Sequence, residues 1–382
     1  MPIFPILFLA VNLKSNVIMS FVNHFRKAPT FWERRGPISL VLWPLSWVYG
    51  LVLRLRKLIA DLNIFNTKPI AVPVIIVGNI RVGGTGKTPI VIALAEKLAE
   101  LGWKPGIISR GYGVKGAQAG SSPAQVTSDS DPRIVGDEPV LIAQRTENQF
   151  PIWVHPKRKD TIAALLMHHP EVNVIISDDG LQHAGLSRWP AREGGRDIEL
   201  VVRDERGEGN HFLLPAGPLR EPATRDRDAT LITAKQSPKA TPLDEYFQGR
   251  RAFTLSPQLG LAYQLHHSSN QQALDSIAEQ SLTKKIAAVA ALGNPQRFFS
   301  SLKKQGIMAK CLPLPDHSTY SAEFFSSIKA DYILITEKDA VKCTEIADER
   351  IWVVPMSVKI PDPLSEWMQS ILQRPDPNQY TL

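Results

Sequence analysis

A glycine-rich turn between an apolar run and a helical pattern constrains this chain more than any other feature. The run 72–77 is rich in β-branched residues, the turn 83–88 reads GGTGKT, and apolar residues recur with helical spacing over 90–101. Strand, glycine-rich loop and helix in this order form a phosphate-binding loop, because the loop's backbone N–H groups and the positive end of the helix dipole face a bound anion. The stretch therefore predicts a nucleotide-binding P-loop.

Two side chains of this loop carry specific chemistry. Lys87 would reach the outer phosphates of a nucleotide, and the Thr88 hydroxyl would hold Mg²⁺. The strict pattern expects glycine at position 81, where this chain has arginine. The alternative, a glycine-rich turn that binds nothing, is disfavoured because Gly-Lys-Thr here follows a buried-type strand. The residues expected to hold the nucleotide are Arg81, Val82, Gly83, Gly84, Thr85, Gly86, Lys87 and Thr88.

A second apolar strand, 172–177, ends in Asp178 and Asp179. Acidic residues at the end of an apolar strand that follows a P-loop form the Walker B arrangement, in which a carboxylate holds Mg²⁺ or one of its waters. Strands and helices alternate along the chain, so we expect ligands at the carboxyl ends of parallel strands. The fold class predicted is α/β, a P-loop (RecA/Rossmann-like) parallel sheet with a second, smaller α/β domain and an N-terminal membrane-associated helix.

The segment before the P-loop has the composition of a membrane-surface helix. Its apolar run, 38–53, is interrupted by Pro44, contains two tryptophans and a tyrosine, and has arginines at both ends. The run is slightly short of the ~20 residues that a spanning helix needs. Aromatic residues suit the headgroup level and arginines suit anionic lipid, so we expect a helix that lies in or dips into the membrane. A buried core helix and a single span are the alternatives.

Composition shifts along the chain predict five segments. They are a poorly defined N-terminal extension (1–30), a membrane-associated helical segment (31–66), a P-loop kinase domain (67–235), a linker (236–250) and a smaller C-terminal α/β domain (251–382). The first 18 residues are apolar but lack the basic start and cleavage site of a signal peptide. Met19 is an alternative start.

Charge and cysteine content exclude some classes of protein and leave others open. The net charge of +7 suits nucleic acid, an anionic membrane or an anionic substrate, and cannot choose among them. A nucleic-acid-binding protein would need a basic stripe with base-stacking aromatic residues, and the sequence has none, so no nucleic acid partner is expected. The two cysteines, Cys311 and Cys343, lie far apart and form no metal or redox motif. This fits a reducing compartment rather than a disulfide framework.

Short motifs continue from the P-loop to the end of the chain. With the GGTGKTP loop, they resemble those of one family, the lipid A tetraacyldisaccharide 4′-kinases of Gram-negative bacteria, over nearly the whole chain after about residue 30. Three features depart from the family's pattern: Glu208 replaces an aromatic residue, Ala184 replaces a tyrosine, and 188–196 is an insertion. The motifs are Phe31-Trp32, Gly78-Asn79, Arg110-Gly111-Tyr112-Gly113, Gly136-Asp137-Glu138-Pro139, 178–183, 214–221, Gly293-Asn294-Pro295, Asp316-His317 and 336–339.

This resemblance implies a reaction, cofactors and a location. The expected enzyme transfers the γ-phosphate of ATP, with Mg²⁺, to the 4′-hydroxyl of a tetraacyl glucosamine disaccharide 1-phosphate and yields lipid IVA. The expected partners are this membrane lipid and the anionic surface of the inner membrane, with no protein partner. The enzyme would be peripheral or monotopic at the cytoplasmic face of the bacterial inner membrane.

The resemblance also assigns roles that the residues alone leave open. Asp137 is expected to accept the proton of the sugar hydroxyl, although an Asp in Gly-Asp-Glu-Pro also suits a helix cap. His317 would orient Asp137, unless it is a surface histidine. Glu221 is a third metal candidate beside Asp178 and Asp179, unless it pairs with Arg220 or Arg225. Candidates for binding the substrate's 1-phosphate or the nucleotide are Arg110, Arg158 and Arg220, and a structural ion-pair cluster without chemistry is expected of Glu337, Lys338 and Asp339.

Two rival functions share parts of this pattern. A membrane-recruited P-loop regulator would carry a lysine just before the paired glycines, where this chain has Val82, and a membrane helix that is usually C-terminal. A soluble P-loop kinase or ligase of a small metabolite would not need the aromatic, arginine-flanked segment 38–57. The kinase of a membrane lipid is therefore the favoured hypothesis.

Overall fold

The computed structural model describes residues 29–61, 70–111, 122–182, 189–233 and 251–375. These residues form two compact units. The first contains residues 29–61, 80–83 and 206–226, and the second contains the other described residues. The His183–Ala184 positions and the expected linker 236–250 lie outside the described residues.

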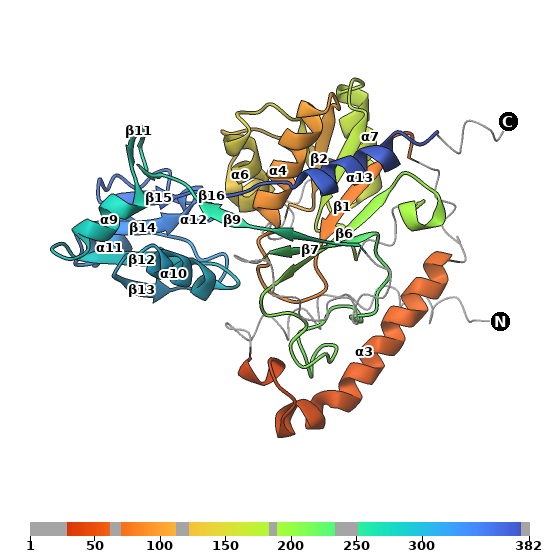
Figure 1. Ribbon diagram of the computed structural model, residues 1–382, viewed down its shortest axis with the longest axis horizontal. Coiled ribbons are helices and arrows are strands. Elements are labelled where there is room, and N and C mark those ends of the chain that lie inside the picture. Colours follow the sequence, from red (N-terminus) through yellow and green to blue (C-terminus); the bar gives the residue numbers. More distant parts are fainter. Residues whose placement is uncertain (1–28, 62–69, 112–121, 183–188, 234–250, 376–382) are drawn as a thin grey trace. The chain divides into compact units, whose positions relative to one another are not determined.

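The first unit is built on one long helix, α3 (Pro37–Asp61), which follows the short 3₁₀ turn η1 (Thr30–Trp32) (Figure 1). Small and aromatic side chains tie this helical segment to the irregular segment 206–226. Ser46 Oγ donates to the Leu213 carbonyl oxygen at 2.7 Å, and Tyr49 OH donates to the Arg220 carbonyl oxygen at 3.0 Å. Segment 206–226 is irregular, so its backbone carbonyl oxygens lack the regular hydrogen bonds of a helix or sheet. These two side chains supply hydrogen bonds to two of them.

Much of the remaining α3 surface is apolar and exposed, up to the basic residues Arg54, Arg56 and Lys57 near its end. The stretch Pro37–Ile59 is long and apolar enough to cross a membrane. The N-terminal apolar helix expected from the sequence is therefore confirmed. Its exposed large apolar residues are Ile38, Leu40, Val41, Trp43, Leu45, Trp47, Val48, Leu51, Val52, Leu55 and Leu58.

Eight strands of the second unit form a sheet with the order β3-β4-β2-β5-β1-β6-β7-β8. All neighbours in it are parallel except β3 and β4, so the sheet is mixed rather than wholly parallel. The central strands are buried on both faces, which explains their continuous apolar sequences. The strands are β1 (Val74–Gly78), β2 (Pro105–Ser109), β3 (Ala124–Val126), β4 (Ile152–Val154), β5 (Val174–Asp178), β6 (Ile198–Asp204), β7 (Ala229–Thr233) and β8 (Arg251–Leu255).

Helices α4 (Lys87–Glu100), α6 (Asp137–Arg145) and α13 (Asp362–Leu372) share one hydrophobic core with this sheet (Figure 1). Alternate residues of β1, Ile75 and Val77, belong to that core, as the pleat of a strand requires. Two further helices of this part of the chain are α5 (Pro132–Val135) and α7 (Arg158–His168), and η3 (Ala191–Glu193) is a 3₁₀ turn within the expected insertion.

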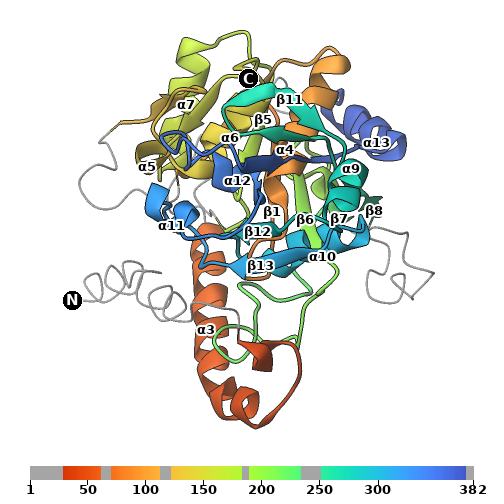
Figure 2. The same cartoon turned by 90° about the vertical axis from the view of Figure 1, so that its left-hand side faces the viewer.

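A second sheet has the order β11-β10-β15-β14-β12-β13. Helix α10 packs in the core on one of its faces and α11 in the core on the other (Figure 2). Strands β9 (Pro257–Leu259) and β16 (Met356–Val358) form a separate antiparallel pair. The remaining elements are β10 (Ala262–Gln264), β11 (His267–Gln272), α9 (Leu274–Gln280), β12 (Ile286–Ala290), α10 (Pro295–Lys304), β13 (Ala309–Pro313), α11 (Ala322–Ser326), β14 (Tyr332–Thr336), α12 (Glu337–Ala340) and β15 (Ile351–Val354).

The chain leaves the large sheet and returns to it. Strand β8 pairs with β7, and Leu364 and Met368 of α13 pack in the core of the large sheet. The predicted boundary at residue 251 places both elements in the smaller domain, because chain order alone does not show that a segment returns. The second sheet is inserted between them.

Candidate active site

The GGTGKT turn leads into α4 as a P-loop should. Gly86 precedes the helix with φ 77°, in the left-handed region that favours glycine, and Lys87 and Thr88 are the first helical residues. The Arg297 guanidinium of α10 donates to the Thr85 carbonyl oxygen at 3.2 Å. A Cβ on Gly86 would lie 2.9 Å from Arg297 Nη1, so the arginine and a side chain at 86 could not share this space.

Lys87 contacts the polar residues that directly follow strands β1 and β5. Its Nζ donates to Asp179 Oδ1 at 2.8 Å and to Asn79 Oδ1 at 2.9 Å. Strands β1 and β5 are parallel neighbours in the register Val77↔Asp178, so the residues after them come together at one edge. The structure thus brings together the loop lysine and the strand-end acids that the sequence singled out.

Asp178 is the most unusual carboxylate of this edge, since only 1% of it is exposed. Neither of its carboxylate oxygens has a hydrogen-bond partner among the described residues. Burial, and to a smaller extent the charge of Glu138, raise its pKa to about 7, while the charge of Lys87 opposes the shift. A buried carboxylate without partners is costly unless a cation or a proton satisfies it.

These features fit a magnesium site of the nucleotide-binding kind. The described residues contain no cluster of three or more His, Cys, Asp or Glu side chains that could hold a metal. Magnesium does not need one, because it keeps several waters and uses one or two carboxylates with substrate phosphates. Asp178 and Thr88 could supply protein oxygens, whereas Asp179 pairs with Lys87.

Asp137 and His317 form a second site. Asp137 begins α6, only 6% of it is exposed, and His317 Nδ1 donates to its Oδ2 at 3.1 Å. Burial raises the pKa of Asp137, but the His317 hydrogen bond and the charge of Lys338 outweigh it and lower the pKa to about 2. The same hydrogen bond raises the pKa of His317. Asp137 also accepts the Glu138 N–H at 3.0 Å, but Gly136 is the cap residue of α6 and no described side chain caps this helix, so Asp137 is its first residue and not its cap.

The residues expected to form a structural ion-pair cluster have their partners elsewhere. Glu337 accepts from Arg145 Nη1, and Lys338 Nζ lies 2.9 Å from Glu138 Oε1 and 3.9 Å from Asp137 Oδ2. Sequence reasoning therefore missed a lysine beside Asp137. The available signal was its place directly after a buried parallel strand, the edge where sites form.

The arginine candidates lie in different surroundings. Arg158 is buried and donates through Nη2 to the Asp178 carbonyl oxygen, while its Nε and Nη1 have no partner among the described residues. Arg110 follows β2 and is exposed. Arg220 belongs to the first unit.

The remaining candidates also belong to the first unit. Arg81 is buried and pairs with Glu33, and Val82 N–H donates to the Pro218 carbonyl oxygen at 2.8 Å. Glu221 pairs with Arg225. The salt bridge that the sequence left open for Glu221 is thus present, and its role toward a metal stays a prediction.

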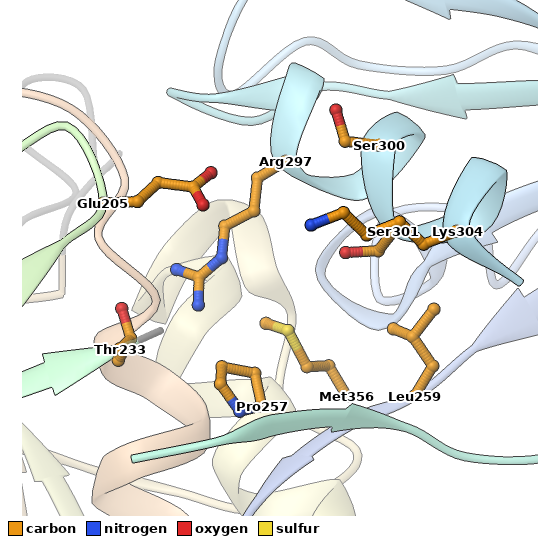
Figure 3. Close-up of a pocket in the computed structure, with 9 residues that line it drawn as sticks. All are labelled: Glu205, Thr233, Pro257, Leu259, Arg297, Ser300, Ser301, Lys304 and Met356. Carbon is orange, nitrogen blue, oxygen red and sulfur yellow. The ribbon is translucent and has the colours of Figure 1, made fainter. Parts of the chain in front are cut away.

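A hollow of the second unit involves the same arginine that contacts the phosphate loop. Arg297 reaches from α10 toward Glu205, which follows β6, and Thr233, the last residue of β7, with Met356 of β16 nearby (Figure 3). Its other lining residues are Pro257, Leu259, Ser300, Ser301 and Lys304. Apolar and charged groups therefore line it together.

Comparison with known proteins decides the family. The family model described as tetraacyldisaccharide-1-P 4′-kinase matches residues 38–373. The chain belongs to this kinase family. The resemblance drawn from the motifs is confirmed, and so is the enzyme class, a kinase of lipid A biosynthesis.

Relatives within the tetraacyldisaccharide 4′-kinase family match along most of their length. The tetraacyldisaccharide 4′-kinase of Polynucleobacter asymbioticus is 69% identical over 367 residues, 95% of this chain and all of the relative. That of Herminiimonas arsenicoxydans is 44% identical over 342 residues, 88% of this chain and 92% of the relative. The crystal structure of LpxK from Aquifex aeolicus in complex with ATP superposes with a TM-score of 0.68 at 26% identity, covering 87% of this chain and 99% of that one.

Proposed function

We propose that this chain transfers the γ-phosphate of ATP to the 4′-hydroxyl of a tetraacyl glucosamine disaccharide 1-phosphate, giving lipid IVA, with Asp137 as the proton acceptor. The observation that carries the assignment is the hydrogen bond, 3.1 Å long, between the buried Asp137 carboxylate and the partly exposed His317. Its ionised carboxylate lies at the start of a helix in the same unit as the phosphate loop. The names of the relatives agree with this substrate.

The reaction breaks one P–O bond and forms another. The 4′-oxygen attacks the γ-phosphorus, the bond from that phosphorus to the bridging oxygen breaks, and ADP leaves with the bonding electrons. The hydroxyl proton passes to the Asp137 carboxylate, which is ionised at neutral pH because its pKa is about 2. Such a weak base suits the loose transition state of phosphoryl transfer, in which positioning and charge matter more than early proton removal.

His317 keeps the acceptor oriented. Its Nδ1–H donates to Asp137 Oδ2, and the Glu138 N–H donates to the other carboxylate oxygen, Oδ1. Both oxygens of the carboxylate are therefore held by a hydrogen bond. A hydrogen-bonded carboxylate samples fewer orientations, so less entropy is lost when the sugar hydroxyl arrives.

The phosphate loop and the acidic strand end would hold the nucleotide and its metal. Lys87 would exchange Asp179 and Asn79 for phosphate oxygens, as a P-loop lysine does. Asp178 and Thr88 are the residues that would hold Mg²⁺, with Asp179 and Glu221 as further candidates. The ion, when bound, would neutralise charge on the β- and γ-phosphate oxygens.

The nucleoside would lie in the hollow that Arg297 lines. In a parallel sheet, ligands bind beyond the carboxyl ends of the strands, and Glu205 and Thr233 stand at the ends of β6 and β7. Arg297 connects this hollow with the loop through Thr85. Met356 and Pro257 supply the apolar surface that a base needs.

The exposed apolar residues of α3 would bring the enzyme to its substrate. The acyl chains of the lipid stay in the bilayer, so the site must work at the cytoplasmic surface of the inner membrane, as a peripheral or monotopic protein does. Arg54, Arg56 and Lys57 near the end of α3 are exposed and would add about 1 kcal/mol each toward anionic lipid.

A direct assay tests this proposal. Purified full-length chain is incubated with ATP, Mg²⁺ and the tetraacyl disaccharide 1-phosphate in mixed micelles, and the lipid products are resolved by mass spectrometry. The expected product is heavier by one phosphate and carries it on the 4′-oxygen. Hydrolysis of ATP without a bisphosphorylated lipid would contradict the proposal and favour the regulatory ATPase.

A further inference from the structure

Two further carboxylates lie near Asp137, the proposed proton acceptor. Asp137 and Glu138 are consecutive at the start of α6, and Asp316 directly precedes His317. Asp137 is buried, whereas the side chains of Glu138 and Asp316 are about one-third exposed. Like charges this close raise one another's pKa and push apart the segments that carry them, unless a cation lies between them.

The ammonium group of Lys338 lies among these carboxylates. Its Nζ is 2.9 Å from Glu138 Oε1, 3.6 Å from Asp316 Oδ1 and 3.9 Å from Asp137 Oδ2. Its side chain is 15% exposed, so solvent screens these interactions only in part. One cation thus connects α6, the loop that carries His317 and α12.

The backbone that carries Lys338 is held by other contacts. Glu337 pairs with Arg145 of α6 and accepts the Met356 N–H at 3.0 Å. Asp339 accepts from Tyr320 OH at 2.8 Å. Because α12 is anchored on both sides of Lys338, removing the ammonium group should leave α12 in place.

We propose that Lys338 is a positioning residue for phosphoryl transfer, which lies between the carboxylates around Asp137 and so holds α6 and the loop of His317 together. The inference rests on the proposed role of Asp137 and goes beyond it. The charged groups that face Asp137 are Glu138 from its own helix, Asp316 and His317 from the loop, and Lys338 and, farther away, Lys342 from the segment around α12. Lys338 is the lysine in contact with Asp137 among the described residues.

The role has a consequence for the titration of His317. The charge of Lys338 opposes protonation of the imidazole, whereas Asp137 and Asp316 favour it. Without Lys338, the imidazolium is left to neutralise the carboxylates, so the pKa of His317 rises. A merely structural lysine would not move this titration.

The experiment compares Lys338→Met with Lys338→Arg, which keeps the charge. Lys97→Met is the matched control, because Lys97 is also only partly exposed and pairs with Glu100 instead. We measure kcat, KM for ATP and the dependence of kcat on pH between about 6 and 9, the range in which histidine titrates. The melting temperature of each variant reports whether it is folded.

Lys338→Met should lower kcat at least about tenfold, leave KM for ATP within about twofold, and move the His317 inflection to higher pH. Lys338→Arg should recover most of kcat, and Lys97→Met should stay within about twofold of the wild type. A kcat near wild type in Lys338→Met, or a loss confined to KM for ATP, would overturn the role. If the methionine variant does not fold, Lys338→Gln takes its place against Lys338→Arg.

Asp137→Asn, measured in parallel, separates this inference from the proposal beneath it. Near-normal turnover in Asp137→Asn would overturn both. A large loss in Asp137→Asn with an unchanged Lys338→Met would overturn only the role of Lys338.

Discussion

Nη1 of Arg145 in α6 lies 2.7 and 2.8 Å from the two carboxylate oxygens of Glu337 in α12. The Glu337 side chain is buried, and its Oε2 also accepts the Met356 N–H at 3.0 Å. The pair therefore joins the helix that begins with Asp137 to the helix that carries Lys338.

Arg145→Leu should destabilise the protein because it leaves the Glu337 carboxylate buried without its partner. We expect a loss of about 2–3 kcal/mol, since Arg145 itself is partly exposed. Arg133→Leu is the control, because its pair with Asp131 is largely exposed and should contribute less than about 1 kcal/mol. Thermal melting of the two variants checks the difference, and equal melting temperatures would contradict the role of the pair.

Arg297→Ala should weaken ATP binding. Loss of a charge-assisted contact is expected to raise KM for ATP about tenfold, with a smaller change in kcat. Lys303→Ala on the same helix is the control, because Lys303 is exposed and does not line the hollow. Steady-state kinetics with varied ATP gives both constants, and an unchanged KM for ATP in Arg297→Ala would exclude the hollow as the nucleoside site.

His317 should make stability depend on pH. The pKa of His317 is raised above its ordinary value of 6.5 by the hydrogen bond with Asp137. A raised pKa in the folded state stabilises the fold fully below about 6.5, and this contribution is lost as the pH rises through the folded pKa. The drop in melting temperature caused by His317→Gln should therefore be larger at about pH 6 than at about pH 9.

The matched control for this titration is His267→Gln, at an exposed histidine of β11. The ionisation of Asp137 does not affect this comparison. Its pKa is lowered in the folded state, so its contribution to stability is lost only as the pH falls from 3.8 towards about 2. A drop for His317→Gln that does not change with pH would show that the ring acts by packing alone.

Trp43 and Trp47 should support membrane binding, although the Trp43 ring also lies 6.2 Å from that of Phe212. Both rings are exposed on α3 and contact each other edge to face with centroids 5.3 Å apart. Replacing both by serine should lower binding to anionic vesicles at least about tenfold, since each buried aromatic side chain contributes roughly 2 kcal/mol. Co-sedimentation with vesicles measures this, with Leu282→Ser and Met308→Ser as exposed apolar controls.

The local sequence pattern was enough to predict those site residues that directly follow a strand. The P-loop and the Walker B acids are each set by a short apolar run and the residues directly after it. That Lys87 and Asp179 meet then follows from β1 and β5 being neighbours in a parallel sheet. The apolar helix α3 was equally visible, because composition and length decide it.

Long-range packing decided what the sequence did not reveal. Strand β3 is three residues long and antiparallel, too short to show a period. Strand β8 and helix α13 pack on the large sheet, although the second sheet lies between them in the chain. The spacing of apolar residues shows that an element is buried, but not which sheet buries it. The contact between Lys338 and Glu138 joins residues 200 positions apart, so no local motif predicts it.

The central claim is that Asp137 takes part in the chemistry rather than in holding the nucleotide. The most direct measurement is turnover of the lipid substrate by Asp137→Asn beside the affinity of the same variant for ATP. Loss of a general base predicts a kcat lower by about 10²–10⁴ with the dissociation constant for ATP within about twofold of wild type. A kcat within about tenfold of wild type, or a loss explained by weakened ATP binding, would contradict it.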